Sequence, residues 1–337
     1  MADKNSHITY LRVIATVFVV LIHASTGFLN HIDTNTFDWN YANWINAAMR
    51  CSVPIFVVIS GALLLQKEEN TLKFYKKRIP KLVFPFFFWT FVYLIYYFYR
   101  YTNFNSLPFE KIIAIAQDKI LHGANAHLWY LYMIIGLYLT IPFLRKIIIQ
   151  SSIKEIELFL LFWLLAMLVS NKGLYAVMPK FDLTFFSGYV GYLVLGYYLS
   201  VKSFNKKRTV YVVGYFLMII IIGWGTYLLN QDAKKLNAFL YNYLFPTTAL
   251  ATSFLFLWVK EWKKENNNTP KWITIIDRYS FGIYLSHIIP LNFLHPFLSQ
   301  YMSTVWVIPL ATITTIIASI GITYLLRKIP FGRYVSG

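Results

Sequence analysis

The stretch TYLRVIATVFVVLIH, residues 9–23, decides the fold because it is a long apolar run that carries two ionisable side chains, Arg12 and His23. With about 100° of rotation per residue, eleven positions bring both side chains to one face of a helix. A rise of about 1.5 Å per residue separates them by roughly 16 Å along the axis. Ionisable side chains at membrane depth are costly and mark candidate functional sites. The alternative is that Arg12 anchors the helix at the interface and that His23 is a polar residue satisfied among helices.

The composition predicts an all-α polytopic membrane protein. Hydrophobic residues make up 58% of the 337 residues and charged residues only 13%, whereas a soluble domain has about 25% charged residues. The apolar segments follow one another without a long polar insert, so we expect residues 1–337 to form a single transmembrane domain. The first segment lacks a small-residue cleavage site, which indicates a retained helix and not a signal peptide.

About 20 apolar residues are needed for a helix to cross the hydrocarbon core. The sequence offers about ten such segments: 8–28, 43–65, 82–100, 127–145, 156–171, 183–201, 209–229, 239–259, 273–293 and 304–326.

The net charge of +17 is distributed in a way that favours a membrane over nucleic acid as the partner. Most of the 31 Lys and Arg residues fall in short loops between apolar segments. A cytoplasmic N-terminus places most of them on the cytoplasmic side, which is the positive-inside pattern. The sequence therefore predicts about ten transmembrane helices with both termini in the cytoplasm.

The segment before the third apolar run concentrates positive charge at the mouth of a helix. Lys77, Arg78 and Lys81 lie there, together with Lys76. Cations at this density suit a phosphate-rich ligand. A cluster that only fixes the topology of the chain is the alternative.

Further candidates lie toward the outer half of the predicted bundle. Arg50, in the segment that also carries a Ser60-Gly61 pair typical of close helix packing, requires a carboxylate or an anionic substrate group as its partner. His127 stands beside Trp129, a combination that suits either acceptor binding or interfacial anchoring. His287, three residues after Tyr284, lies about 14 residues, or roughly 21 Å, from the cytoplasmic end of its helix. That depth is close to that of His23, so a shared site is possible.

Several other site types are not supported. The single cysteine, Cys51, allows neither an intramolecular disulfide nor a thiolate metal cluster. The chain has no HExxH or GxSxG motif and no carboxylate pair at ligand spacing. Zinc-hydrolase and serine-hydrolase chemistry therefore have no support, and we expect no metal.

Five motifs, in this order along nearly the whole chain, resemble acyltransferase family 3. They are Arg12 with His23, the PIFVVISG run at 54–61, KRIPK at 77–81, HLWYL at 127–131 and SFGIYLSH at 280–287. The KRIPK motif departs from the family's arginine-x-x-arginine form, because its second basic position is Lys81. Lysine keeps the charge but loses bidentate phosphate geometry.

The resemblance implies an O-acyltransferase of the bacterial inner membrane. Such an enzyme moves an acyl group, usually acetyl, from cytoplasmic acetyl-CoA or another acyl-CoA to a hydroxyl of a cell-surface polysaccharide or a lipid-linked glycan precursor. It also implies that Arg12 and His23 are catalytic and that Lys77, Arg78 and Lys81 hold the CoA phosphates. The chain is most similar to the stand-alone branch of the family, so we expect no fused extracytoplasmic esterase-like domain.

Two questions stay open at the level of sequence. His23 could deprotonate the acceptor hydroxyl for direct transfer, or it could form a transient acyl-histidine. The rival function is an exporter or flippase of polysaccharide intermediates without chemistry, which ten helices and an intramembrane Arg50 also suit. Binding of acyl-CoA distinguishes the two functions, because an exporter has no use for it.

Overall fold

The computed structural model describes residues 6–30, 32–102, 108–170, 183–204, 206–265 and 268–336, and in these ranges it contains helices and loops but no strand. The all-α prediction is confirmed. The elements are α1 (Ser6–Leu29), α2 (Phe37–Met49), α3 (Ser52–Leu64), α4 (Thr71–Arg78), α5 (Pro80–Tyr101), α6 (Phe109–His122), η2 (Ala126–Leu128), α7 (Trp129–Gln150), α8 (Ile153–Val169), η4 (Thr184–Phe186), α9 (Val190–Val201), α10 (Arg208–Asn230), η5 (Phe239–Tyr241), α11 (Pro246–Glu265), α12 (Lys271–Ser286), α13 (Ile288–Ser299), α14 (Thr304–Leu326) and α15 (Gly332–Val335).

Every predicted apolar segment contains a helix, but only some of these helices are long enough to cross a membrane. Six stretches in the described part of the chain meet the length and hydropathy that a span requires: Ser6–Leu29, Phe37–Leu64, Thr71–Tyr101, Ala126–Gln150, Arg208–Asn230 and Thr304–Leu326. The figure of ten spans and the cytoplasmic placement of both termini therefore stay predictions.

Two of the predicted segments each consist of two α-helices, which corrects the expectation of one helix for each. Segment 43–65 is α2 followed by α3, with Arg50 and Cys51 between them. Segment 273–293 is α12 followed by α13, joined at His287. A proline removes the backbone bond to the residue four positions before it and presses its ring on that carbonyl. Pro54 acts in this way on Arg50, and Pro290 on Ser286.

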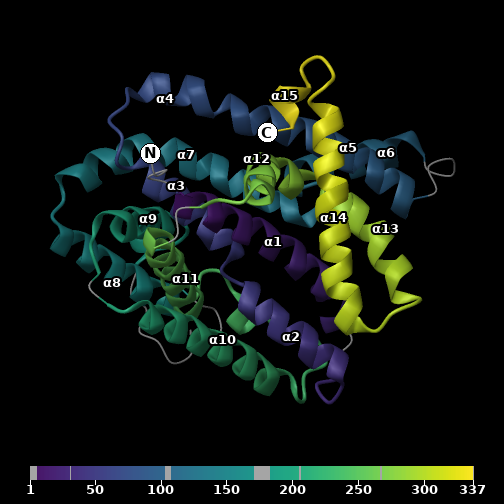
Figure 1. Ribbon diagram of the computed structural model, residues 1–337. Helices are drawn as coiled ribbons and strands as arrows, with labels where there is room; N and C mark the ends of the chain where they lie inside the picture. Colours follow the sequence, from purple (N-terminus) through teal and green to yellow (C-terminus); the bar gives the residue numbers. More distant parts are fainter. Residues whose placement is uncertain are drawn as a thin grey trace.

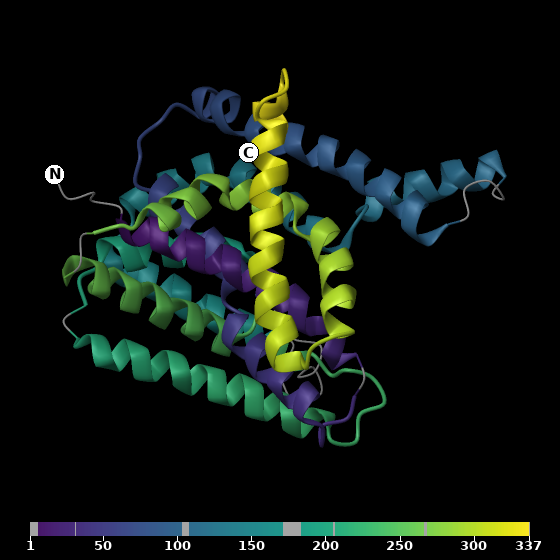
Figure 2. The same cartoon turned by 45° about the vertical axis from the view of Figure 1, so that its right-hand side comes forward.

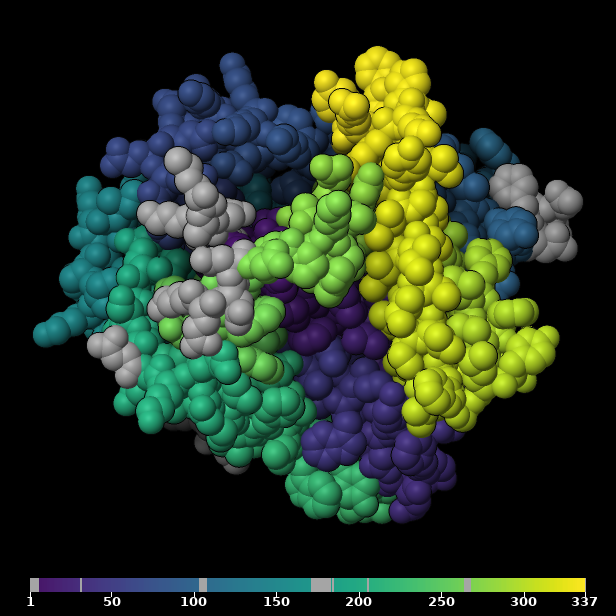
Figure 3. All heavy atoms as spheres, in the orientation of Figure 1, coloured from purple at the N-terminus to yellow at the C-terminus, as the bar shows by residue number. Residues whose placement is uncertain are grey.

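Helix α1 lies at the centre of the molecule. It packs against α2, α3, α11, α12 and α14, and α14 crosses in front of it (Figures 1 and 2). In the space-filling view α1 is visible only in the gap that these helices leave between them (Figure 3). Leu11, Ala15 and Val20 are completely buried. A polar side chain on α1 therefore projects among other helices.

Helices α3 and α9 approach each other backbone to backbone through two glycines. A Cβ atom on Gly61 would lie 2.0 Å from the Leu193 carbonyl oxygen, and one on Gly196 would lie 2.0 Å from the Val58 carbonyl oxygen. Small residues permit such contact between membrane helices. The close packing that Ser60-Gly61 predicts is confirmed.

The outward faces of the long helices are apolar. On α10 these faces present Phe216, Ile220 and Trp224, and on α14 they present Trp306 and Ile317, all of which are half exposed or more. Such a surface is compatible with a lipid environment and would be unfavourable in water.

Candidate active site

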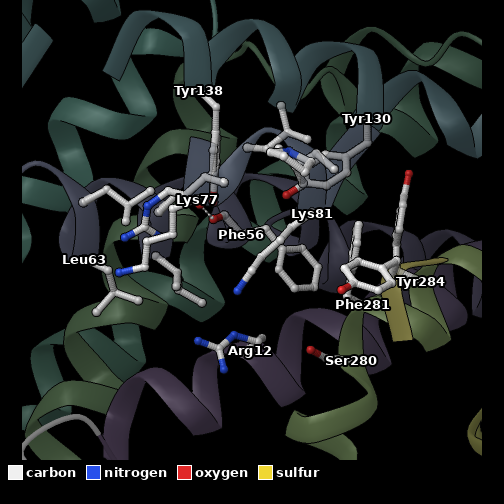
Figure 4. Close-up of a pocket in the computed structure, with 18 of the residues that line it drawn as sticks. Arg12, Phe56, Leu63, Lys77, Lys81, Tyr130, Tyr138, Ser280, Phe281 and Tyr284 are labelled. Carbon is white, nitrogen blue, oxygen red and sulfur yellow. Dashed lines mark hydrogen bonds between the residues drawn. The ribbon is translucent and has the colours of Figure 1, made fainter. Parts of the chain in front are cut away.

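A cavity of about 770 Å³ opens among α1, α3, α7, α12, α15, the end of α4 and the start of α5. Six lysine and arginine side chains lie in its wall together with aromatic and aliphatic side chains. The Arg12, Lys77 and Lys81 side chains lie toward one end, and the Tyr130 and Tyr284 rings lie toward the other (Figure 4).

The predicted phosphate-binding residues meet at the basic end of this cavity. Lys77, Arg78 and Lys81 all line it, beside Lys76. Lys77 and Arg78 share one carboxylate, that of Glu69, at 3.7 and 3.8 Å. Both ion pairs are long; Lys77 is 58% exposed, whereas Arg78 and Glu69 are mostly buried. One carboxylate thus faces two cations and neutralises them only in part.

A buried arginine holds this basic segment in place. Arg145 of α7 is 4% exposed, and its guanidinium donates to the carbonyl oxygens of Leu64 at 3.1 Å and Glu69 at 3.0 Å. The guanidinium groups of Arg145 and Arg78 each lie 5.2 Å from the centre of the Phe74 ring. Arg145 thus fixes the loop that presents Arg78 to the cavity.

Arg12 lines the same cavity and is also held by a carboxylate. Its Nη1 lies 2.5 Å from Oδ1 of Asp277 on α12, and both side chains are mostly buried. Asp277 therefore neutralises a cation on the central helix while leaving part of its guanidinium turned to the cavity. Nothing in the sequence indicates that Asp277, 265 positions further along the chain, pairs with Arg12.

The aromatic end of the cavity contacts a cluster of imidazole rings. Tyr284 lines the cavity, donates its hydroxyl proton to the His127 carbonyl oxygen and has its ring centre 5.7 Å from that of His127. Its ring also lies 6.1 Å from that of His287. Tyr284 thus stands between the cavity and the histidines.

Three histidines from three different parts of the chain form this cluster. The His23 ring centre lies 5.0 Å from that of His287 and 6.4 Å from that of His127, and His127 and His287 are 5.0 Å apart. His23 and His287, for which their similar depth suggested a shared site, therefore lie side by side. Within the described ranges no group of three His, Cys, Asp or Glu side chains is arranged to hold a metal ion.

The hydrogen bonds of the cluster determine which imidazole nitrogens are open to substrate. His287 Nδ1 lies 2.7 Å from the Tyr284 carbonyl oxygen, which can only accept, so Nδ1 carries the proton and Nε2 carries the lone pair. That Nε2 is buried and has no partner among the described residues. His127 bonds Asn125 through Nδ1 at 2.9 Å. His23 is partly exposed and forms no hydrogen bond within the described part of the chain.

Arg50, at the break between α2 and α3, belongs to a separate polar network beyond the histidines. It donates to Asn46, whose amide donates to Ser25 of α1 at 2.5 Å. The Arg50 guanidinium lies 4.2 Å from the centre of the Tyr241 ring and 5.7 Å from that of Tyr243. It has no carboxylate partner in the part of the chain that the structure describes, and its Nε is buried without a partner.

Trp129 lies on the Arg50 side and not in the histidine cluster, although it is only two residues from His127. Its ring stacks on Tyr243 at 5.8 Å, and it is 37% exposed. The HLWYL motif thus contributes His127 to the histidine cluster and Trp129 to the surroundings of Arg50.

Sequence reasoning missed Asn43 and Asn46, although their spacing with Arg50 follows one helical face. It missed Arg333 at the cavity wall because nothing in the pattern links the C-terminal segment to the loop before α5.

The Arg12–Asp277 pair predicts a measurable coupling between α1 and α12. Asp277→Asn leaves a largely buried guanidinium without its counterion, so we expect a lower thermal unfolding midpoint in detergent, and Arg12→Gln should act similarly. A double-mutant cycle should give a coupling free energy of about 1–2 kcal/mol, between the values for exposed and buried pairs. Lys271→Gln, a charge removal at the exposed start of α12, is the control and should change the midpoint little. Strict additivity of the two substitutions would refute the pairing.

Comparison with known proteins gives one match. No curated protein and no solved structure matches the chain significantly. A family model described as an acyltransferase domain matches residues 5–324, nearly the whole chain. That range includes the basic segment, the three histidines and Arg50. The chain therefore belongs to acyltransferase family 3.

Proposed function

We propose that this protein is a multi-pass enzyme of the bacterial inner membrane that transfers an acetyl group from cytoplasmic acetyl-CoA to a hydroxyl of a cell-surface polysaccharide or of its lipid-linked precursor. Membership of the family supports membrane acyl transfer. The observation that carries the proposal further is the cavity with six cations in its wall and a tyrosine in contact with the histidine cluster.

The cavity has the chemistry that an acyl-CoA requires. The nucleotide end of CoA carries several phosphate charges, for which Lys77, Arg78 and Lys81 supply the cations, with Lys76 and Arg333 beside them. The pantetheine arm is mostly uncharged, and apolar side chains, Ile59, Leu63 and Ile134 among them, share the wall with the cations. In this arrangement the thioester lies toward Tyr130 and Tyr284.

The histidine cluster supplies a base for transfer. The acceptor hydroxyl oxygen attacks the thioester carbonyl carbon, and the carbon–sulfur bond breaks. The hydroxyl proton moves to an imidazole nitrogen and from there to the departing thiolate sulfur. His23, which is partly exposed and has no hydrogen bond among the described residues, is the proposed base, and His287, with its Nε2 lone pair, is the neighbour that can share the proton. Attack by the imidazole itself, giving an acyl-histidine, is the alternative route.

The Arg50 network suits a glycan acceptor. Aromatic faces such as those of Trp129 and Tyr243 pack on sugar rings, and these two side chains stack on each other. Arg50 lies against the Tyr241 and Tyr243 rings and pairs with no carboxylate of the described ranges, so it can pair with an acidic group of the acceptor. The network joins α1 two residues beyond His23 through Ser25.

Substitution of His23 tests the catalytic proposal. Purified His23→Gln protein in nanodiscs should lose at least about a hundredfold in the rate of acetyl transfer or acetyl-CoA hydrolysis, because a general base contributes that much or more. Stabilisation of the protein by CoA, measured as a shift in the thermal unfolding midpoint, should persist. His122→Gln, which changes an exposed histidine on α6, is the matched control. Full activity of the His23 variant would remove His23 from the reaction, and failure of CoA to stabilise the wild type would favour an exporter.

The donor site is tested by Arg78→Ala. Loss of a charge-assisted phosphate contact should raise the KM for acetyl-CoA about tenfold while the KM for the glycan acceptor stays the same. Lys73→Ala on the same helix removes an equal charge outside the cavity wall and should leave both constants unchanged. If the Arg78 and Lys73 variants behave alike, the basic segment has only a topological role.

A further inference from the structure

A second basic hollow lies next to the donor cavity, where the C-terminal segment meets α12 and α14. Its volume is about 470 Å³, and its wall is formed by four cations and two tyrosines: Arg278, Tyr279, Tyr324, Arg327, Lys328 and Arg333. No carboxylate lines it among the residues that the structure describes. Its residues come from α12, from the end of α14 and just after it, and from α15, and Figure 1 shows these elements close together.

Two of the four cations of this hollow lie against tyrosine rings. The Arg327 guanidinium lies 4.6 Å from the centre of the Tyr279 ring and donates to the Arg278 carbonyl oxygen at 3.2 Å. The Lys328 ammonium lies 4.6 Å from the centre of the Tyr324 ring. Within the described ranges, Arg278, Lys328 and Arg333 form no ion pair with an acidic side chain. The nearest carboxylate in sequence, that of Asp277, is bound to Arg12.

A tight turn after α14 brings Arg333 to the hollow. Phe331 adopts a left-handed backbone conformation with φ of 61°, and a Cβ atom on Gly332 would lie 1.7 Å from the Leu326 carbonyl oxygen. Only glycine fits such an approach. The chain then runs back to α5, where the Trp89 indole donates to the Val335 carbonyl oxygen at 3.0 Å. The arrangement of cations is therefore built into the fold and does not result from a loose charged tail.

Apolar side chains stand beside the hollow on the outer surface. Leu325 is 63% exposed, Ile329 is 54% exposed and Phe331 is 81% exposed. Positive charges that only set topology need to lie in a loop, but they need not converge on one hollow. A concave cationic site next to exposed apolar side chains is complementary to a molecule with a phosphate group and hydrocarbon chains.

We propose that this hollow binds the phosphate headgroup of an anionic phospholipid, with its acyl chains along α14. A free phosphate-bearing anion shares the headgroup chemistry, but it would leave Leu325, Ile329 and Phe331 uncovered. The proposal does not depend on acyl transfer, because Arg278 and Lys328 do not line the donor cavity.

Native mass spectrometry of the purified full-length protein, titrated with phosphatidylglycerol or phosphatidylcholine, tests the proposal. The wild type should retain phosphatidylglycerol in preference to phosphatidylcholine. Each cation near a lipid headgroup strengthens binding about fivefold, so Arg278→Gln with Lys328→Gln should weaken retention of phosphatidylglycerol roughly 25-fold. Arg278→Lys with Lys328→Arg keeps both charges and should keep most of the binding.

Control measurements distinguish a phospholipid headgroup from free phosphate, and they show whether the variants are folded. Lys271→Gln, an exposed charge removal on α12 outside the hollow, should bind phosphatidylglycerol as the wild type does. Thermal unfolding midpoints in phosphatidylcholine nanodiscs should agree between wild type and double variant, and nanodiscs of phosphatidylglycerol and phosphatidylcholine in equal amounts should stabilise only the wild type. Equal retention by all variants would overturn the proposal. Stabilisation of the wild type by inorganic phosphate as strong as by the lipid would overturn the assignment to a phospholipid.

Discussion

The site depends on one constraint, which is that backbone polar groups freed inside an apolar bundle must find partners within the protein. Pro290 removes the backbone bond to the Ser286 carbonyl oxygen, and α12 ends at that residue. Side chains bond the two carbonyl oxygens that precede it: Leu285 accepts from the Tyr93 hydroxyl at 2.9 Å, and Tyr284 accepts from His287 Nδ1 at 2.7 Å. The bond to Tyr284 orients His287, whose Nε2 has no partner among the described residues. The end of the broken helix thus fixes one histidine of the cluster.

The charges of the molecule are arranged around this uncharged centre. Cations gather at one end of the cavity, where Glu69 and Asp277 only partly neutralise them. Tyr130 and Tyr284 separate them from the imidazole rings, and Arg50 stands beyond the rings with aromatic partners. This order, from phosphate-binding cations through a neutral base to a second cation with aromatic faces, matches the order of groups in an acyl-CoA followed by a sugar acceptor. This match is the physical reason for the proposed function.

Much of this arrangement could be predicted from the sequence because it is local. The helix that carries Arg12 and His23 is continuous, each apolar segment contains a helix, and Lys77, Arg78 and Lys81 meet at one cavity. The breaks could not be predicted, since Pro142 lies inside a continuous helix whereas Pro54 follows an interruption. The partners of Arg12 and of the basic segment could not be predicted either. Asp277 reaches Arg12, and Arg333 reaches the cavity, through tertiary packing, on which the spacing of residues carries no information.

The central claim is that the thioester of bound acyl-CoA lies at the histidine cluster. The most direct test is a cryo-electron microscopy structure of the protein in nanodiscs with a non-hydrolysable acetyl-CoA analogue. In that structure the phosphates should contact Lys77, Arg78 or Lys81, and the acyl carbonyl carbon should lie next to the imidazole cluster. An acceptor oxygen bonded to His23 should then stand at a near-attack distance of roughly 3–3.5 Å from that carbon. A structure with the nucleotide outside the basic cavity, or with the acyl carbonyl remote from all three histidines, would contradict it.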